Sequence, residues 1–299
     1  MTVVQIQLSH KKMNSTVRLR KTPAVFLLLL SSAFTMHALD MADSHTLRPD
    51  SGSIFQLNPV TDGILLGTGL TLNITARIIE NKLTTVSFAD ENGYDAVSVN
   101  QFDRLLMRPY SKALDYTATI LTCTTILTPA LLLTTEKKEW LTIGTMYAES
   151  LMLSWGIKEM MKDCISRYRP YMYFSDFPAD KVEDGDYMQS FPSGHTTLAF
   201  TGAAFTTFVF CSYFPDSPWT IPVIAGSYTL AAATAALRIA GGSHYLTDVL
   251  AGAAVGTVSG LLVPLLHTYV FKRTNNEAGH IKPYAFEAAP YGFDVVIRF

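Results

Sequence analysis

The strongest constraint on the fold is a series of apolar segments, each close to the roughly 20 residues that cross the hydrocarbon core of a bilayer. The five segments cover residues 113–134, 140–161, 195–214, 219–240 and 245–271. Only 16% of the side chains are charged, whereas soluble domains have about 25%. Because backbone polar groups in a bilayer must be satisfied internally, such segments are expected to be helices. The sequence therefore predicts an all-α fold, a polytopic helical membrane bundle with five or six spans.

A sixth span would come from residues 62–82, which have a helical pattern but are only weakly apolar. Asn73 and Arg77 interrupt this segment, so we expect a helix and leave its membrane crossing open. The last two strong segments are dense in glycine and alanine, which lets helices approach closely. Asp115 and Glu149 lie inside two of the expected spans, where a carboxylate needs a partner.

The N-terminus has the pattern of an export signal. A basic region ends at Lys21, an apolar run covers residues 24–30, and small residues follow, which favours a cleaved signal peptide over an N-terminal anchor. The rest of the chain carries 18 basic and 25 acidic side chains, a net charge of −7, and does not resemble a nucleic-acid surface. The three cysteines, an odd number without a C-x-x-C pair, do not indicate a disulfide framework or a zinc site.

Three short clusters at the edges of the apolar segments carry the chemistry. They are K-x6-R-P at Lys162–Pro170, P-S-G-H at Pro192–His195 and R-x5-H-x3-D at Arg238–Asp248. In the first cluster, Lys162 and Arg169 are two helical turns apart, so a helix places them on one face. Arginine can bind a phosphate through two hydrogen bonds, and lysine acts as a point charge. A positive flank beside a membrane span would give the same pattern.

The second cluster comes immediately before an apolar helical segment. Ser193 is a good N-cap, and Gly194 allows a ligand to approach the backbone. Because a helix N-terminus offers free N–H groups, it can bind an anion, and His195 would stand beside that anion as a proton donor. A capped helix with a surface histidine is the alternative. The preceding loop, residues 171–191, is acidic and is interpreted as a solvated outer loop.

The third cluster contains a glycine break. Arg238 ends one helical segment before Gly241-Gly242, and His244 opens the next. His244 and Asp248 are four residues apart, so their side chains lie on one helix face. A carboxylate on one imidazole nitrogen fixes the tautomer and leaves the other nitrogen free to attack.

In this order, the three clusters resemble the three-part signature of the type-2 phosphatidic acid phosphatase superfamily. That family contains membrane lipid phosphatases, soluble bacterial acid phosphatases and vanadium haloperoxidases. The motifs cover residues 162–248, and residues 1–112 match nothing in the core signature. The resemblance implies an all-α fold with the active site at one membrane face. One position departs from the pattern, because Leu237 stands where a serine usually precedes the third-motif arginine.

The resemblance also implies a role for each motif residue. His244 would be the nucleophile that forms a phosphohistidine, Asp248 would orient it, and His195 would be the general acid to the leaving alcohol. The remaining motif residues would bind the phosphate: Lys162, Arg169, Ser193, Gly194 and Arg238. No metal and no cofactor are implied.

These predictions divide the chain into four regions. They are a signal peptide or anchor at 1–38, a polar linker with amphipathic helices at 39–112, a phosphatase core with the transmembrane helices at 113–272, and a C-terminal tail at 273–299. After signal cleavage, five spans would place Lys137-Lys138 and Lys272-Arg273 in the cytoplasm, as the positive-inside rule prefers. The three clusters would then face the periplasm.

The leading hypothesis is a phosphatase that hydrolyses a lipid phosphate or diphosphate monoester at the outer face of a bacterial inner membrane. Its partners would be the lipid substrate and membrane lipids, without nucleic acid. Polyprenyl diphosphate, phosphatidylglycerol phosphate, phosphatidic acid and lipid A are all candidate substrates. A soluble exported acid phosphatase is the first alternative, which the modest mean hydropathy of +0.21 keeps open. A non-enzymatic membrane scaffold or transporter that retains the motifs is the second.

Overall fold

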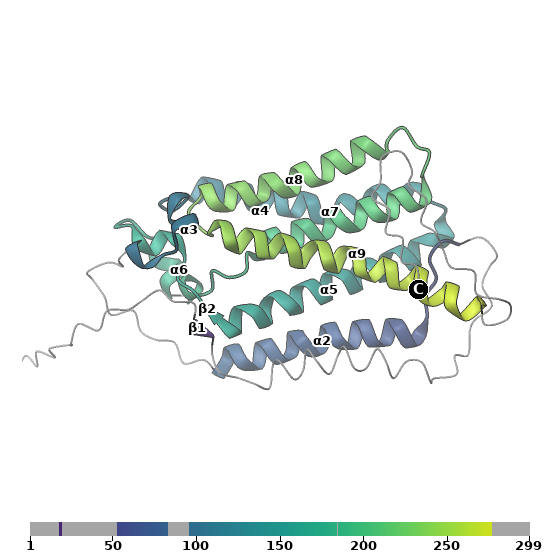
Figure 1. Ribbon diagram of the computed structural model, residues 1–299, viewed down its shortest axis with the longest axis horizontal. Coiled ribbons are helices and arrows are strands. Elements are labelled where there is room, and N and C mark those ends of the chain that lie inside the picture. Colours follow the sequence, from purple (N-terminus) through teal and green to yellow (C-terminus); the bar gives the residue numbers. More distant parts are fainter. Residues whose placement is uncertain (1–17, 20–52, 83–95, 184, 277–299) are drawn as a thin grey trace, which may run out of the picture.

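The computed structural model of the protein describes residues 18–19, 53–82, 96–183 and 185–276. The expected signal or anchor at residues 1–38, apart from Arg18–Leu19, and most of the C-terminal tail lie outside the described residues. Six long helices make up most of the described chain (Figure 1). They are α2 (Pro59–Lys82), α4 (Lys112–Ile126), α5 (Trp140–Cys164), α7 (Gly194–Tyr213), α8 (Thr220–Ala240) and α9 (Leu246–Asn276).

The remaining elements are short, and the helical ones number seven within the described ranges. They are η2 (Ala96–Ser98), α3 (Gln101–Leu105), η3 (Thr128–Thr134), η4 (Lys137–Glu139), η5 (Pro170–Tyr173), α6 (Ala179–Glu183) and η6 (Asp186–Met188). The two-residue strands β1 (Arg18–Leu19) and β2 (Ile165–Ser166) pair antiparallel. The fold is therefore mostly helical, as predicted, with one short β pair that the helical periodicity of the sequence does not indicate.

Helix α7 lies at the centre of the bundle, where it contacts α4, α5, α8 and α9. Several of its side chains, including Ala199, Ala203 and Phe205, have no exposed surface. Helix α2 lies on the outside and packs along α5 (Figure 1). The short elements α3, α6, β1 and β2 gather at one end of the bundle, where α7 and α9 begin and α5 and α8 end (Figure 1).

Glycines in α9 allow it to pack against the backbone of α7. A Cβ atom at Gly252 would lie 2.6 Å from the carbonyl oxygen of Ser193, and one at Gly256 would overlap the carbonyl oxygen of Thr197. The expectation that small residues permit close helix approach is therefore confirmed for α9. This contact holds the N-termini of α7 and α9 next to each other, because the Ser193 N–H donates to the Asp248 carbonyl oxygen at 3.1 Å.

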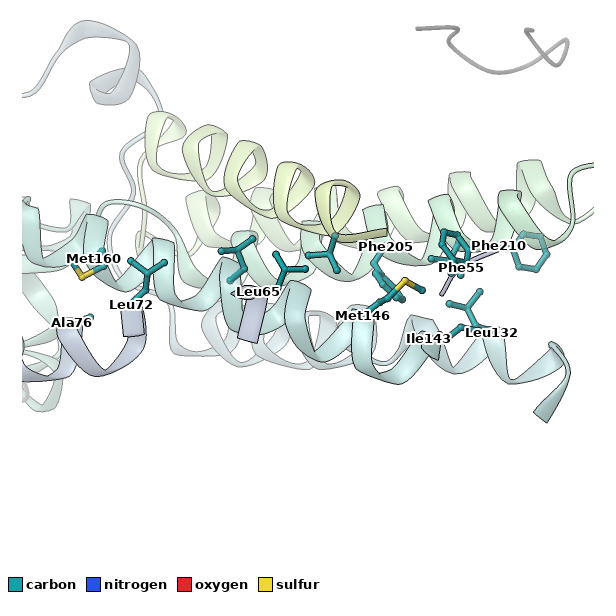
Figure 2. Packing of buried hydrophobic residues seen from close by; sticks show 13 residues of the cluster. Phe55, Leu65, Leu72, Ala76, Leu132, Ile143, Met146, Met160, Phe205 and Phe210 are labelled. Carbon is teal, nitrogen blue, oxygen red and sulfur yellow. The ribbon is translucent and has the colours of Figure 1, made fainter. Parts of the chain in front are cut away.

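The main hydrophobic cluster joins α2 to the rest of the bundle. Phe55, Leu65 and Leu72 belong to the same buried cluster as Met146 of α5 and Phe205 of α7 (Figure 2). Helix α2 begins at Pro59, so its first residues come from the predicted extended linker. The predicted helix at residues 62–82 is present, and its packing makes it part of the bundle.

Within the described residues, three helical stretches are long and apolar enough to cross a membrane: Lys112–Thr134, Thr220–Ala240 and Leu246–Thr268. Helices α5 and α7 form where spans were predicted but are not among these three. Both contain several buried polar side chains, such as Glu149 and Thr201. The predicted count of five or six spans is not confirmed and stays a prediction.

The close contact of α7 and α9 yields a prediction about stability. Replacing Gly256 with alanine forces the two backbones apart, and overpacking of this kind costs about 1–3 kcal/mol. We therefore expect Gly256→Ala to lower the unfolding midpoint of the detergent-solubilised protein by several degrees. Gly226→Ala in α8 is the matched control, because a Cβ atom there meets nothing within 4 Å. Equal midpoints for the two variants would contradict this account of the contact.

Candidate active site

The structure brings the three predicted clusters together at one end of the bundle. Lys162 is in the last turn of α5, and Arg238 is in the last turn of α8. His195 is in the first turn of α7, His244 lies just before α9, and Asp248 is in the first turn of α9. Because α8 runs antiparallel to α7 and α9, residues distant in sequence meet at the same end.

His244 is held in a defined tautomer. Its side chain is 2% exposed, and its Nδ1 lies 2.7 Å from the backbone carbonyl oxygen of Ser190. Because a carbonyl oxygen can only accept a hydrogen bond, Nδ1 carries the proton. The other nitrogen, Nε2, lies 3.2 Å from Nη1 of Arg169, which can only donate. Nε2 therefore carries the lone pair, as a nucleophile requires.

The surroundings of His244 keep its ring neutral. Burial is the largest factor that lowers its pKa well below the usual value, and the charges of Arg169, Arg238 and Lys162 lower it further. Desolvation and nearby like charges both disfavour the imidazolium. The lone pair on Nε2 is consequently available at neutral pH without the help of an external base.

Asp248 lies near His244 but does not make the bond that fixes its tautomer. The distance from His244 Nδ1 to Asp248 Oδ2 is 3.6 Å, longer than a hydrogen bond. Asp248 instead accepts from the Ser190 hydroxyl at 2.6 Å, from the Tyr245 N–H at 2.9 Å and from Arg167 at 2.5 Å. The carboxylate therefore fixes Ser190, and the Ser190 carbonyl orients His244.

Arg167 connects this network to the segment before α4. Its guanidinium donates to Asp248 and to Asp103, each at 2.5 Å, and to the Thr247 hydroxyl at 2.7 Å. Asp103 also accepts from the Thr247 N–H at 3.0 Å. Burial opposes ionisation of Asp103, but hydrogen bonds from Thr247 and Arg167 hold its pKa below the usual value.

Asp103 and Arg167 were not part of the site predicted from the sequence. Asp103 is fully buried in α3, within a stretch predicted only as part of an amphipathic linker. No local pattern distinguishes it, because its partner Arg167 is far away in the chain. Arg167 does lie inside the first motif, two residues before Arg169. This second arginine, next to an apolar segment, was the available signal.

Arg169 is oriented by a residue of the acidic loop. Its Nη2 binds the Asp186 carboxylate at 2.5 Å, and its Nε donates to the Asp186 carbonyl oxygen at 2.9 Å. This leaves Nη1 directed at His244 and at the Ser243 carbonyl oxygen. Burial opposes ionisation of Asp186, but the charges of Arg169 and Lys162 lower its pKa. The prediction of a merely solvated loop is therefore wrong for Asp186.

Arg238 is held by a carboxylate from another helix. Its Nη1 forms an ion pair with Oδ1 of Asp115 in α4, which also accepts from the Ser243 hydroxyl at 3.2 Å. Asp115 thus holds Arg238, and it gains the partner that a carboxylate inside an expected span requires. The Nε of Arg238 is buried without a hydrogen-bond partner among the described residues.

Two lysines add positive charge on the α5 side. The pKa of Lys162 is lowered to about 8, chiefly by burial and then by the charges of Lys158 and Arg169. Lys158, one turn earlier, is 4% exposed and lies with its Nζ 3.9 Å from the ring centre of Trp155. The Lys158 side chain also runs beside Gly194, at an ordinary contact distance from where a Cβ atom would be. Lys158 was not part of the predicted site.

The N-terminus of α7 contributes its free N–H groups and His195. Ser193 is the N-cap residue and is fully buried, although its hydroxyl makes no capping bond. His195 Nε2 lies 3.1 Å from the hydroxyl of Thr119 in α4, which fixes the ring. Donors at a helix N-terminus favour an anion. The end of α7 therefore faces the same way as the cations from α5 and α8.

The arrangement suits a bound anion better than a bound cation. Four carboxylates at this end of the bundle are each ion-paired with an arginine: Asp103, Asp115, Asp186 and Asp248. They are consequently not free to act as metal ligands. The cations, the helix N-terminus and the unprotonated Nε2 of His244 together can hold a tetrahedral oxyanion and attack it.

Parts of the chain are similar to known proteins. Over 89 residues the chain is 40% identical to a lipid A 1-phosphatase of Porphyromonas gingivalis, an alignment that covers 30% of this chain and 19% of that relative. A crystal structure titled as that of the first transmembrane PAP2 type phosphatidylglycerolphosphate phosphatase, from Bacillus subtilis, matches 69% of this chain and 96% of that one. Its TM-score is 0.39 and its sequence identity is 19%.

The family match covers the part of the chain that contains the site. Residues 143–272, from α5 to α9, match the family model of the PAP2 superfamily. All three predicted clusters fall within this range. Residues 143–272, which contain the candidate site, are therefore similar to the PAP2 superfamily.

Proposed function

We propose that the protein is a membrane phosphatase that hydrolyses a lipid phosphate or diphosphate monoester through a phosphohistidine intermediate. The observation that carries this proposal is the buried, unprotonated Nε2 of His244, 3.2 Å from Nη1 of Arg169. A phosphoryl group bound to Arg169 would present its phosphorus to that nitrogen. Arg238 and Lys162 add charge on the same side, and fixed cations stabilise the charge on the transferring group.

The reaction would proceed in two transfers. In the first, Nε2 of His244 forms a bond to phosphorus while the bond from phosphorus to the lipid oxygen breaks, and His195 gives a proton to that oxygen. In the second, a water oxygen forms a bond to phosphorus while the bond from phosphorus to Nε2 breaks, and His195 takes a proton from that water. Inorganic phosphate leaves, His244 regains its lone pair and His195 regains its proton. The proton stays on Nδ1 throughout, hydrogen-bonded to the Ser190 carbonyl oxygen, and this bond stabilises the ring when Nε2 is phosphorylated.

The membrane-embedded form is favoured over a soluble acid phosphatase by the fold. Three stretches of the described residues are suited to cross a bilayer, and Arg238 lies at the end of one of them. A phosphorylated lipid headgroup would lie at that depth in the interface. The aligned relative is named for dephosphorylation of lipid A, which makes a lipid phosphate the substrate class to test first, with lipid A among the candidates.

The function is tested by phosphate release from a panel of lipid mono- and diphosphates in detergent micelles, against water-soluble phosphate esters of matched charge. We expect lipid substrates to be preferred, and His244→Ala to lose about 10⁴–10⁶-fold in turnover, because the attacking atom is gone. Retention of a tenth of the activity in His244→Ala would refute the nucleophile assignment.

The matched control for that variant is His195→Ala, which removes the proposed general acid. It should slow lipid hydrolysis yet react nearly normally with an ester whose leaving group needs no proton, such as para-nitrophenyl phosphate. Quenched wild-type enzyme should carry an acid-labile, base-stable phosphoryl group that His244→Ala lacks. Equal loss on both esters in His195→Ala would argue against its acid role.

The lowered pKa of Lys162 predicts a pH dependence. Lys162 is protonated below its pKa of about 8, so phosphate binding should weaken as pH rises through that value. An arginine stays charged throughout this range. We therefore expect the alkaline limb of kcat/KM near pH 8 to move upward by at least one unit in Lys162→Arg. Lys138→Arg, at an exposed position, is the control and should leave the pH profile unchanged. If the alkaline limb of kcat/KM does not move in Lys162→Arg, that limb belongs to another titrating group.

The orientation of the site is also a proposal. We expect the end that carries His244 to face the periplasm, because Lys137-Lys138 lie at the opposite end of α5 and cations favour the cytoplasmic side. A cysteine at exposed Asp176, in a background without Cys123, Cys164 and Cys211, should react with an impermeant thiol reagent in intact spheroplasts. One at Lys138 should react only after lysis, and the reverse pattern would place the site in the cytoplasm.

A further inference from the structure

A second cluster of ionisable side chains lies far from the phosphate site. It consists of Asp62 on α2, Glu149 on α5 and His267 on α9, whose ligand-type atoms all lie within 4.8 Å of one another. His267 is six helical turns beyond the start of α9, about 30 Å along the axis from His244. Ionisable residues within a stretch suited to span a membrane are expected to have a function or a partner.

Glu149 is the residue that requires an explanation. Its side chain has no exposed surface, and neither carboxylate oxygen has a hydrogen-bond partner among the described residues. The nearest charged group is His267, with Nε2 3.4 Å from Oε2. A buried carboxylate without hydrogen bonds is strongly destabilising unless a cation compensates it. Oε2 faces His267 in the cluster, so a partner for this oxygen belongs there.

His267 is oriented in the way that metal-binding histidines are. Its Nδ1 lies 2.8 Å from the carbonyl oxygen of Val263, one turn back on α9, so Nδ1 donates and Nε2 faces the carboxylates. Such a bond from the outer nitrogen fixes the ligating nitrogen of most metal-bound histidines. Nε2 is also 2.9 Å from Oδ1 of Asp62, which places one nitrogen and two carboxylates around a common point.

The charge of the cluster suits a divalent cation. Asp62 and Glu149 with a protonated His267 leave one uncompensated negative charge among apolar helices. A divalent cation with neutral His267 and both carboxylates is neutral overall. The spacing of the ligand atoms also suits a metal. In a tetrahedral site with bonds of about 2.0–2.1 Å, the ligand atoms are about 3.3 Å apart. Nε2 of His267 is 2.9 Å from Oδ1 of Asp62 and 3.4 Å from Oε2 of Glu149.

We propose that Asp62, Glu149 and His267 bind one divalent transition-metal cation of the zinc class. The imidazole nitrogen favours such a metal over Mg²⁺ and Ca²⁺, which prefer oxygen ligands alone. The site is structural, because it lies at the opposite end of the bundle from His244. It ties α2 to α5 and α9, and α2 makes its main contacts with α5. The site does not depend on the proposed phosphatase reaction.

The test uses the tag-free, full-length protein in detergent, stripped with a chelator and titrated with Zn²⁺ and, separately, Mg²⁺. We expect one equivalent of Zn²⁺ to bind by calorimetry and elemental analysis, at least tenfold more tightly than Mg²⁺, and to raise the unfolding midpoint. Weak binding without a fixed stoichiometry, or equal affinity for both cations, overturns the proposal.

Variants locate the bound metal. Glu149→Gln and Asp62→Asn keep the side-chain shapes and should each weaken Zn²⁺ binding at least tenfold, whereas His244→Ala should bind Zn²⁺ as the wild type does. Should Glu149→Gln not give a monodisperse protein, the partly exposed Asp62 supplies the deciding variant. Wild-type affinity in Asp62→Asn, or loss of binding in His244→Ala, would place the metal elsewhere and refute the assignment.

Discussion

The close packing of α7 against α9 is the contact on which the candidate active site depends. Gly252 and Gly256 permit backbone-to-backbone approach, and the Ser193 N–H reaches the Asp248 carbonyl oxygen at 3.1 Å. This hydrogen bond joins the second motif directly to the third. A larger residue at either glycine would separate the anion-binding end of α7 from His244, even though both helices would still form.

The sequence predicted the helices well, because helical periodicity and apolar length are local properties. The segment 140–161 became α5, and 219–240 became α8, each within a few residues. The motif residues meet at one end as expected, since antiparallel helices bring their alternate ends together. Asp103 and Ser190 were missed, because their roles come from contacts between distant segments that leave no local pattern. Asp115 was recognised as needing a partner, but only the structure identifies Arg238.

The arginines of the site are held by carboxylates, of which Asp103 and Asp248 are fully buried. Arg167 is fixed by Asp103 and Asp248, Arg169 by Asp186, and Arg238 by Asp115. Breaking one side of a buried pair leaves an uncompensated charge, so these supporting acids matter as much as the arginines. The first motif thus contains two arginines with different tasks: Arg169 faces His244, and Arg167 holds the framework around Asp248. Because this framework is complete without a ligand, little ordering remains to be done when an anion binds.

The tautomer of His244 is set by the backbone carbonyl of Ser190, and this has a consequence for how the family can diverge. A carbonyl group is present whatever side chain stands at that position, so substitution cannot delete the acceptor. What must be preserved is the path of the chain between the acidic loop and α7. The Ser190 hydroxyl, which donates to Asp248, helps to hold this path, while the acceptor for the Nδ1 proton belongs to the backbone. Comparison of side chains alone would never reveal that a backbone carbonyl sets the tautomer of His244.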